Sequence, residues 1–509
     1  MSNSPPNTFS IPPMDSHNQK LVSNVHPPDW VNPEPARRYN LVVIGGGTAG
    51  LVTAVGSASL GARVALIERH LLGGDCLNVG CVPSKCLIRS SRVVHEIRTG
   101  SEFGVFTQGD PNVDFRAVME RLRRVRTRIS QHDSADRFRE LGVDVFMGGG
   151  RFTGPRSVEV KEKTLNFKKA VIATGTHPIQ PQIDGLTEAG FLTNETVFSL
   201  TERPARLAVV GGGPIGCELS QAFHRLGSQV TLIEISPQVL GREHPEAARI
   251  LTQTFQREGI DVRLSTRLTK VSNETGKTLY LEKDGNTEIL EVDEILVAVG
   301  RAPNLDTLNL KAVGVEYQRE GIRVNDYLQT TNPDIYAAGD ICMNWKFTHA
   351  ADAAARLVIQ NALFLGRKKL SGLTMPRCTY TDPEIAHVGI SEEDAKAQGF
   401  EVETFVQPVN EVDRGIIEGE EEAFVKVLVK KHTDKILGAT IVARSAGDMI
   451  GEITLAIVAG VGLKTLSRVI NPYPTRAEAI KQLGDAYNRT RLTPFLKAVL
   501  SFWLSWTRK

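Results

Sequence analysis

Cys76 and Cys81 stand in a run of mostly glycine, small and apolar residues that extends from Gly73 to Lys85. Paired thiols can form a structural disulfide, bind a metal ion, or exchange two electrons as a dithiol and a disulfide. A structural zinc site would need two further Cys or His ligands at short spacing, and the neighbouring sequence does not supply them. We therefore predict a redox-active pair and no resident metal.

A glycine-rich turn precedes the cysteines and directly follows an apolar strand. Gly45, Gly47 and Gly50 have the spacing that lets a pyrophosphate approach backbone N–H groups at a helix N-terminus. The next apolar strand ends at Glu68, which is placed to accept hydrogen bonds from an adenosine ribose. The order of strand, turn, helix, strand and acid predicts a dinucleotide site beside the thiols.

The same device recurs later in the chain. Gly211, Gly213 and Gly216 form the second turn. Glu234 lies as many residues after Gly211 as Glu68 lies after Gly45. Two dinucleotide sites are therefore predicted. A disulfide needs a two-electron relay to a diffusible donor, so we expect FAD at one site and a nicotinamide nucleotide at the other.

These motifs together resemble the flavoprotein disulfide reductases, the family of dihydrolipoamide dehydrogenase, glutathione reductase and mercuric reductase. Gly175 lies in a segment that resembles the crossover from the flavin domain to the nicotinamide domain, and Gly300 and Arg301 lie in one that resembles the return. Asp340 ends a segment that resembles the second flavin motif. Within the family, the segments around the cysteines and around Tyr473 are most similar to mercuric reductase-like proteins.

The resemblance implies an α/β fold with two Rossmann-like dinucleotide-binding domains, for FAD and NAD, and a C-terminal α+β dimerisation domain, hence a homodimer. The predicted domains are FAD-binding at 39–174 and 301–372, NAD(P)-binding at 175–300, and dimerisation at 373–487. Residues 1–38 are rich in Pro, Asn and Ser and are predicted to be disordered or draped over the body. Residues 488–509 form an apolar and basic tail.

The resemblance also assigns roles to single residues. Cys81 would contact the flavin as a thiolate, while Cys76 would be the interchange thiol that meets the substrate. A free thiol has a pKa near 8.5, so Cys81 needs help from a helix N-terminus and from Lys85, which is expected to pair with Glu218. The predicted cofactor-binding residues are Gly45, Gly47, Gly50, Glu68, Lys85, Gly175, Gly211, Gly213, Gly216, Glu234, Gly300, Arg301 and Asp340.

Glu234 bears on the choice of nucleotide. A carboxylate at this position accepts a hydrogen bond from a free 2'-hydroxyl and repels a 2'-phosphate. The sequence therefore favours NADH as the electron donor, with NADPH, which the family's mercuric reductases generally use, as the alternative.

The predicted substrate end departs from the pattern of thiol-oxidising members. Those proteins have a His before Pro-Thr and a Glu after it, which together deprotonate a dithiol, whereas this chain has Tyr473 and Glu478. A phenol with a pKa near 10 is a poor base at neutral pH. Tyrosine here is typical of mercuric reductases, yet no cysteine follows Cys378 to pass a metal ion inward. His349, His387 and His432 are interpreted as structural or solvent-facing.

The sequence thus predicts an NAD(P)H-dependent FAD disulfide oxidoreductase with an unidentified small disulfide or electrophile as acceptor. The alternatives are a mercuric ion reductase, a dihydrolipoamide dehydrogenase, a quinone or oxygen reductase, and a non-catalytic flavoprotein docked to a membrane. A net charge of +2 with no basic stripe gives no reason to expect nucleic-acid binding. Few cysteines and a polar N-terminus predict a cytoplasmic protein. The tail is a candidate for weak contact with a membrane surface.

Overall fold

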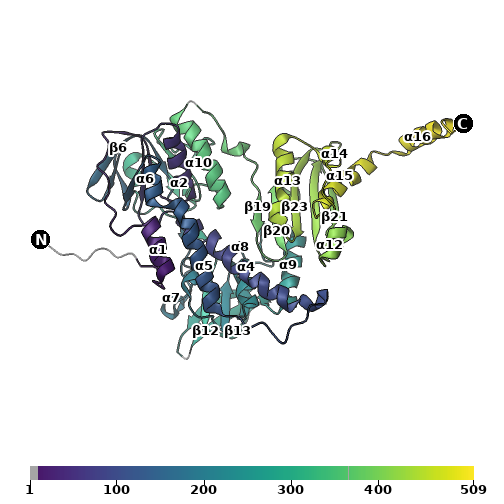
Figure 1. Ribbon diagram of the computed structural model, residues 1–509, viewed down its shortest axis with the longest axis horizontal. Helices are drawn as coiled ribbons and strands as arrows, with labels where there is room; N and C mark the ends of the chain where they lie inside the picture. Colours follow the sequence, from purple (N-terminus) through teal and green to yellow (C-terminus); the bar gives the residue numbers. More distant parts are fainter. Residues whose placement is uncertain (1–9, 275, 365, 509) are drawn as a thin grey trace. The chain divides into compact units, whose positions relative to one another are not determined.

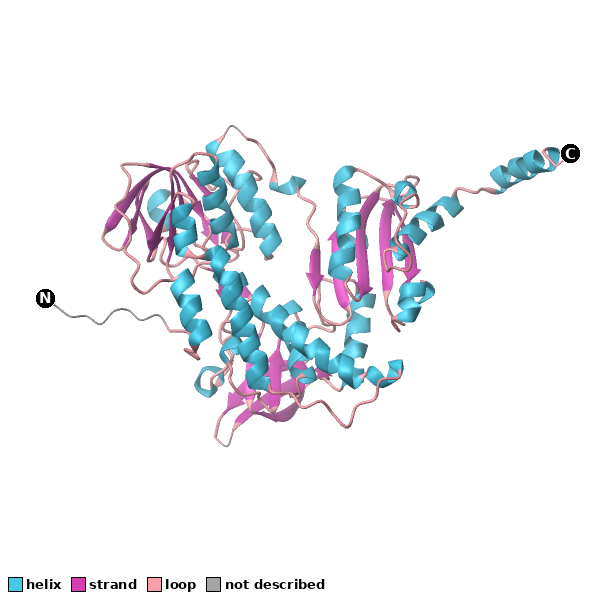
Figure 2. Cartoon of the chain, in the orientation of Figure 1, coloured by secondary structure: helices cyan, strands magenta, loops and turns pink. Residues whose placement is uncertain are grey.

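The structure is a computed structural model that describes residues 10–508 apart from 275 and 365. The chain divides into two compact units (Figures 1 and 2). One unit is Met1–Val239 with Glu258–Leu373, and the other is Leu240–Arg257 with Thr374–Lys509. The mixed α/β architecture and the C-terminal antiparallel domain agree with the predicted fold class.

The first unit contains a sheet in the order β3-β2-β1-β6-β5-β4, with β18 beside β6. Neighbouring strands from β3 to β6, and β18 with β6, are parallel, and their apolar runs are almost fully buried, as expected when helices cover both faces of a sheet. Helices α2 (Thr48–Ser59) and α10 (Thr348–Leu363) pack against each other beside this sheet. The strands are β1 (Tyr39–Ile44), β2 (Val64–Glu68), β3 (Val143–Met147), β4 (Gly150–Gly154), β5 (Ser157–Val160), β6 (Lys163–Ile172) and β18 (Ile335–Ala337).

A second parallel sheet, in the order β10-β9-β8-β14, repeats this arrangement around the second glycine turn, and an antiparallel sheet of β11, β12 and β13 lies beside it in sequence. A short antiparallel ribbon of β7 (Thr176–Pro178) and β15 (Arg301–Pro303) places the two crossovers between the halves side by side. The other strands are β8 (Arg206–Val210), β9 (Gln229–Ile233), β10 (Asp261–Arg263), β11 (Arg267–Ser272), β12 (Lys277–Lys283), β13 (Asn286–Val292), β14 (Glu294–Val297), β16 (Tyr317–Gln318) and β17 (Gly321–Ile322).

The second unit is built on an antiparallel sheet in the order β19-β20-β23-β22-β21. Helix α13 (Ala446–Ala459) packs on β20 and β23, and α15 (Glu478–Thr490) packs on β21 and β22, which encloses a separate apolar core. The segment Leu240–Arg257, predicted within the nicotinamide domain, groups with this unit because its side chains pair there; one such pair is Arg257 with Glu422 at 2.7 Å. The strands are β19 (Arg377–Thr379), β20 (Glu384–Gly389), β21 (Val402–Pro408), β22 (Phe424–Lys430) and β23 (Ile436–Ala443).

The remaining helices connect these sheets or flank them, and α3 and α4 carry the two cysteines. In the first unit they are α3 (Gly74–Asn78), α4 (Cys81–Arg98), α5 (Phe115–Ser130), α6 (Ala135–Glu140), α7 (Leu186–Ala189) and α8 (Pro214–Arg225). In the second unit they are α11 (Glu392–Ala397), α12 (Asp413–Ile417), α14 (Leu463–Leu466) and α16 (Pro494–Trp506), while α9 (Pro245–Glu258) ends at the boundary between the units. Over the described residues, no helix is both long enough and apolar enough to cross a membrane.

The N-terminal extension is ordered where the structure describes it, which corrects the prediction of disorder in favour of a draped segment. Helix α1 (Ser16–Val25) is capped by Asp15, whose carboxylate accepts the backbone N–H of Asn18 at 2.9 Å. Asn18 Oδ1 in turn accepts from Arg126 of α5 at 2.6 Å, and the apolar face of α1 is buried. One short helix among prolines gives too weak a periodicity to be recognised in the sequence. Residues 1–9 of the predicted segment lie outside the described residues.

Candidate active site

The two predicted redox cysteines lie on successive helices of the first unit. Cys76 is in α3 and half-buried, whereas Cys81 is the first residue of α4 and exposed. Both cysteines are free in the structure. No side chain caps the N-terminus of α4, and its unpaired N–H groups and helix dipole favour a negative charge on Cys81.

The thiol pair is electrostatically asymmetric. A hydrogen bond from the Cys76 thiol lowers the pKa of Cys81 to about 6, with smaller help from the Thr348 hydroxyl, 3.3 Å from the Cys81 sulfur, and from the charge of Lys85. The same hydrogen bond, together with burial, raises the pKa of Cys76. At neutral pH the negative charge therefore resides on Cys81, and Cys76 carries the proton.

Lys85 lies one helical turn after Cys81 in α4, and its ammonium group donates to Glu218 Oε2 at 2.7 Å. The Glu218 carboxylate is buried in α8, the helix that opens at the second glycine turn. The structure thus brings together the two residues that the resemblance pairs. Their contact joins the cysteine helix to the helix that follows the second glycine turn.

We expect Lys85→Met to raise the apparent pKa of the Cys81 thiol by about one pH unit, because a cation that stabilises the thiolate is removed. The measurement is a pH titration of thiolate absorbance in the reduced protein. Arg89→Met, one turn further along α4, is the matched control and should leave the titration unchanged. An unchanged midpoint in Lys85→Met would show that Lys85 does not act on this sulfur.

The first glycine turn has the shape of a pyrophosphate cradle. Gly45 has a φ of +108°, and a Cβ there would overlap the carbonyl oxygen of Ala173. A Cβ at Gly50 would overlap the carbonyl oxygen of Gly45, so the helix packs directly on the turn. At Gly47, in contrast, a Cβ would meet nothing nearer than the Cα of Gly74 at 3.8 Å. The turn is tight at its ends and open at its middle, which fits a bound pyrophosphate.

The second turn has the same construction. A Cβ at Gly216 would overlap the carbonyl oxygen of Gly211, and a Cβ at Gly213 would have nothing within 4 Å. Glu68 accepts the backbone N–H of Gly46, in its turn, at 2.5 Å and the backbone N–H of His70 at 2.6 Å. Glu234 makes the corresponding bonds at 2.6 and 2.7 Å. Each carboxylate is thus held at the mouth of its turn with lone pairs left for ribose hydroxyls.

The cysteine segment is built onto the flavin cradle. The Gly73 N–H donates to the carbonyl of Gly46 at 2.8 Å, and a Cβ on Gly74 would lie 2.6 Å from the Cα of Gly47. Asp340, predicted to contact the ribityl chain, accepts from Thr176 at 3.2 Å, and burial raises its pKa. The residues present therefore fit FAD at the first turn, close to the thiols.

Arg301, predicted only as a cofactor residue, holds the cysteine segment through protein contacts. Its guanidinium pairs with Asp75, the neighbour of Cys76, and donates to the carbonyl of Thr176 at 2.9 Å and to Asn194 at 3.1 Å. Asn194 donates in turn to the carbonyl of Val79 at 3.2 Å. The cysteine segment is thus held at two points, at Asp75 within α3 and at Val79 directly after it. The crossovers contribute their own glycines, Gly175 with a φ of +64° and Gly300 with a φ of +130°.

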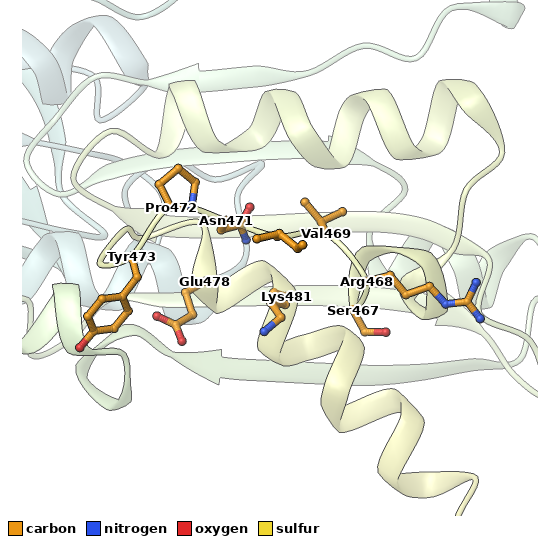
Figure 3. A pocket seen from close by; sticks show the side chains of 9 residues that line it. Ser467, Arg468, Val469, Asn471, Pro472, Tyr473, Glu478 and Lys481 are labelled. Carbon is orange, nitrogen blue, oxygen red and sulfur yellow. The ribbon is translucent and has the colours of Figure 1, made fainter.

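Tyr473 and Glu478 lie in the second unit, at one end of a cavity of about 340 Å³ (Figure 3). The Tyr473 side chain is 72% exposed, and its hydroxyl donates to Asp413 Oδ2 at 2.6 Å. This bond raises the pKa of the phenol above its ordinary value, so even less of the phenolate that could accept a proton is present at neutral pH. The cavity is lined by Ser467, Arg468, Val469, Ile470, Asn471, Pro472, Tyr473, Glu478 and Lys481.

The histidines considered in the sequence do not supply the missing base in this cavity, since none of them lines it. His387 is buried in β20, lies 3.0 Å from the hydroxyl of Thr440, and has a pKa lowered to about 4 by burial. His349 stacks on Phe347 in the first unit, with ring centroids 5.3 Å apart.

Two family models match the chain. The model described as pyridine nucleotide-disulphide oxidoreductase matches residues 39–355, and the model of that family's dimerisation domain matches residues 375–483. The chain belongs to the pyridine nucleotide-disulphide oxidoreductase family. Members of this family use FAD and NAD(P)H, and the dimerisation domain supports a homodimer.

Similar proteins within the family carry different names. A mercuric reductase of Staphylococcus aureus is 35% identical over 89% of this chain and 83% of its own length. A dihydrolipoyl dehydrogenase of Thermus scotoductus is 34% identical over 89% of this chain and 98% of its own length. The solved Cu(II) complex of RclA, a HOCl-induced flavoprotein disulfide reductase from Escherichia coli, matches with a TM-score of 0.78 and 26% identity over 87% of this chain and 98% of its own. The comparisons therefore establish the family of the protein but not its electron acceptor.

Sequence reasoning missed several residues of the site. Thr348 and Asn194 contact the cysteine segment from positions far away in the sequence, and no local motif marks either one. Asp75 and Asp413 had weak signals, a charged residue beside a cysteine and an acid in a short helix, but neither signal names a partner.

Proposed function

We propose that the protein passes electrons from NADH through FAD to the Cys76–Cys81 pair and from there to a small disulfide or electrophile. The observation that carries the proposal is the asymmetric thiol pair at the N-terminus of α4, backed onto the first glycine turn. FAD, when bound, supplies two-electron exchange between the nicotinamide and the thiols. With a disulfide acceptor, NADH, one proton and the disulfide yield NAD⁺ and two thiols.

The geometry of the pair suggests how Cys76 reacts without an external base. Interaction with Cys81 and burial raise the pKa of its thiol, so Cys76 is the protonated member of the pair. As the Cys76 sulfur bonds to the acceptor, its proton can pass to the Cys81 thiolate. This route suits a protein in which Tyr473 is a weak base. It favours an acceptor that needs only a nucleophilic thiol over a dithiol that must first be deprotonated.

A panel of acceptors tests the proposal. Steady-state NADH oxidation by the purified protein is measured with oxidised glutathione, lipoamide, mercuric ion and quinones. We expect turnover with at least one disulfide or thiol-reactive electrophile and loss of that turnover in Cys76→Ser. Turnover with quinones alone that persists in Cys76→Ser would overturn the proposal, because flavin chemistry would then bypass the thiols.

Mercuric ion is the second candidate acceptor. Mercuric reductases are among the similar proteins, and the solved Cu(II) complex of RclA shows a related protein with a transition-metal ion. Soft metal ions bind thiolates, which Cys81 supplies at neutral pH. By resemblance to mercuric reductases, in which a phenol can help hold the ion, Tyr473 is the candidate for a further ligand.

We expect NADH to be preferred over NADPH, and Glu234→Ala to narrow the difference. The substitution removes a carboxylate that would repel a 2'-phosphate, and it removes one charged hydrogen bond to a ribose hydroxyl, worth about 1.5 to 3 kcal/mol. The nearby Arg263 is already paired with Asp261 at 2.8 Å and with Glu288 at 2.9 Å, so a 2'-phosphate would have to compete for it.

The measurement is kcat/KM for each nucleotide, with Glu282→Ala on the exposed surface of β12 as the control. A wild-type preference for NADPH would contradict the assignment of NADH as the electron donor.

A further inference from the structure

Helix α16 (Pro494–Trp506) is exposed along its whole described length although most of its side chains are apolar. The side chains of Phe495 and Phe502 are 79% and 76% exposed. Burying large apolar side chains is favourable, so a helix of this composition is stabilised when a second surface covers it. The arrangement of polar and charged residues along the helix indicates which kind of surface covers it.

Polar side chains follow a single stripe of this segment. Lys497, Ser501 and Ser505 recur every four residues, which places them on one side of the helix, and Arg508 follows just after the helix ends. The remaining surface is a broad apolar arc that ends in two tryptophans. The apolar residues of that arc are Phe495, Leu496, Val499, Leu500, Phe502, Trp503, Leu504 and Trp506.

The charge of the segment has one sign. Beyond Asp485 the sequence contains no Asp or Glu, and the cations Arg489 and Arg491 precede the helix. With 13 residues, α16 is about 20 Å long, shorter than the roughly 30 Å hydrocarbon core of a bilayer. A wide apolar arc, a narrow polar stripe that carries Lys497, cations on both sides of the helix and a length too short to span all suit a helix that lies in a membrane interface.

We propose that α16 binds the surface of an anionic lipid bilayer, with its apolar arc in the acyl boundary and Lys497 and Arg508 among the headgroups. A second copy of the chain fits less well, because a seam between two helices needs a narrower apolar stripe than this arc and would leave much of the arc uncovered. A homodimer carries two copies of α16, and binding is strengthened without a new contact when both copies reach one surface. The inference concerns location and is independent of the acceptor.

Vesicle sedimentation with the full-length holoprotein tests this. We expect binding to vesicles of phosphatidylcholine mixed with phosphatidylglycerol, weaker binding to phosphatidylcholine alone, and weakening by salt. Trp503→Gln on the apolar arc should lower the partition coefficient at least about tenfold, while Ser501→Gln on the polar stripe is the matched control and should change it less than about twofold. An unchanged rate of NADH oxidation in Trp503→Gln verifies that the body is folded.

Three results would overturn the proposal. The first is absence of binding to the anionic vesicles, and the second is binding that Trp503→Gln leaves intact. The third is equal, salt-independent binding to both vesicle types, which would remove the role of the cations. Sedimentation equilibrium distinguishes the competing occupant: if Trp503→Gln lowers the oligomeric mass without affecting vesicle binding, α16 covers a second copy of the chain.

Discussion

Replacing Cys81 by Ser should abolish acceptor-dependent NADH oxidation, and replacing Cys76 by Ser should abolish it equally, each by about ten-thousandfold or more. The two variants should nevertheless differ in colour. Cys76→Ser leaves the Cys81 thiolate beside the flavin, so a long-wavelength absorbance should be present without any reductant. Cys81→Ser should lack it.

The hydrogen bond between the thiols sharpens this test. Because the Cys76 thiol is the main cause of the low pKa of Cys81, the apparent pKa should be higher in Cys76→Ala, which cannot donate, than in Cys76→Ser, which can. A titration of the long-wavelength absorbance between about pH 5 and 9 measures both midpoints around the free-thiol pKa. If Cys76→Ser shows no such absorbance anywhere in this range, the assignment of the two cysteines is reversed or wrong.

Tyr473→His should raise dihydrolipoamide oxidation from a very low level, by about a hundredfold to ten-thousandfold if the new imidazole is correctly oriented. The wild-type phenol cannot serve as the base, since Asp413 raises its pKa further. Glu478, which lines the same cavity, is the carboxylate expected to orient the imidazole. Rates of NAD⁺ reduction with dihydrolipoamide measure the effect, and Tyr473→His combined with Glu478→Ala is its control.

Mercuric ion gives the opposite expectation at the same position. Reduction of the ion needs thiolates and ligands but no base, so Tyr473→Phe should impair mercury-dependent NADH oxidation and leave flavin reduction by NADH unchanged. Fast dihydrolipoamide turnover by the wild-type protein, abolished by Glu478→Ala, would contradict both expectations and favour a dihydrolipoamide dehydrogenase.

The residues of the site that could be predicted are those whose roles follow from the spacing of residues close to them in the sequence. Gly45 and Gly50 are required by a turn of a few residues, and Lys85 shares a helical face with Cys81, so spacing alone places them. The partner of Lys85 came from the family resemblance. The overall fold followed in the same way, because strands that are apolar throughout and glycine turns that begin helices define each Rossmann-like half.

The parts that were missed depend on tertiary packing. Asp75 meets Arg301 because the two crossovers pair as a ribbon beside the cysteine segment, and neither residue has a local signal for the other. Helix α1 is stabilised by Arg126 and by burial against α5, although its own composition is typical of a disordered segment. Thr348 reaches Cys81 from the start of α10 in the same way.

An anaerobic titration of the holoprotein with NADH tests the central claim most directly, because it counts the electrons that the protein accepts. A thiol pair in redox contact with FAD predicts uptake of two equivalents of NADH per flavin, with the long-wavelength absorbance maximal after the first. Cys76→Ser and Cys81→Ser should each accept one equivalent. If the wild-type protein also accepts one equivalent and the absorbance does not develop, Cys76 and Cys81 lie outside the path of the electrons and the proposed function is contradicted.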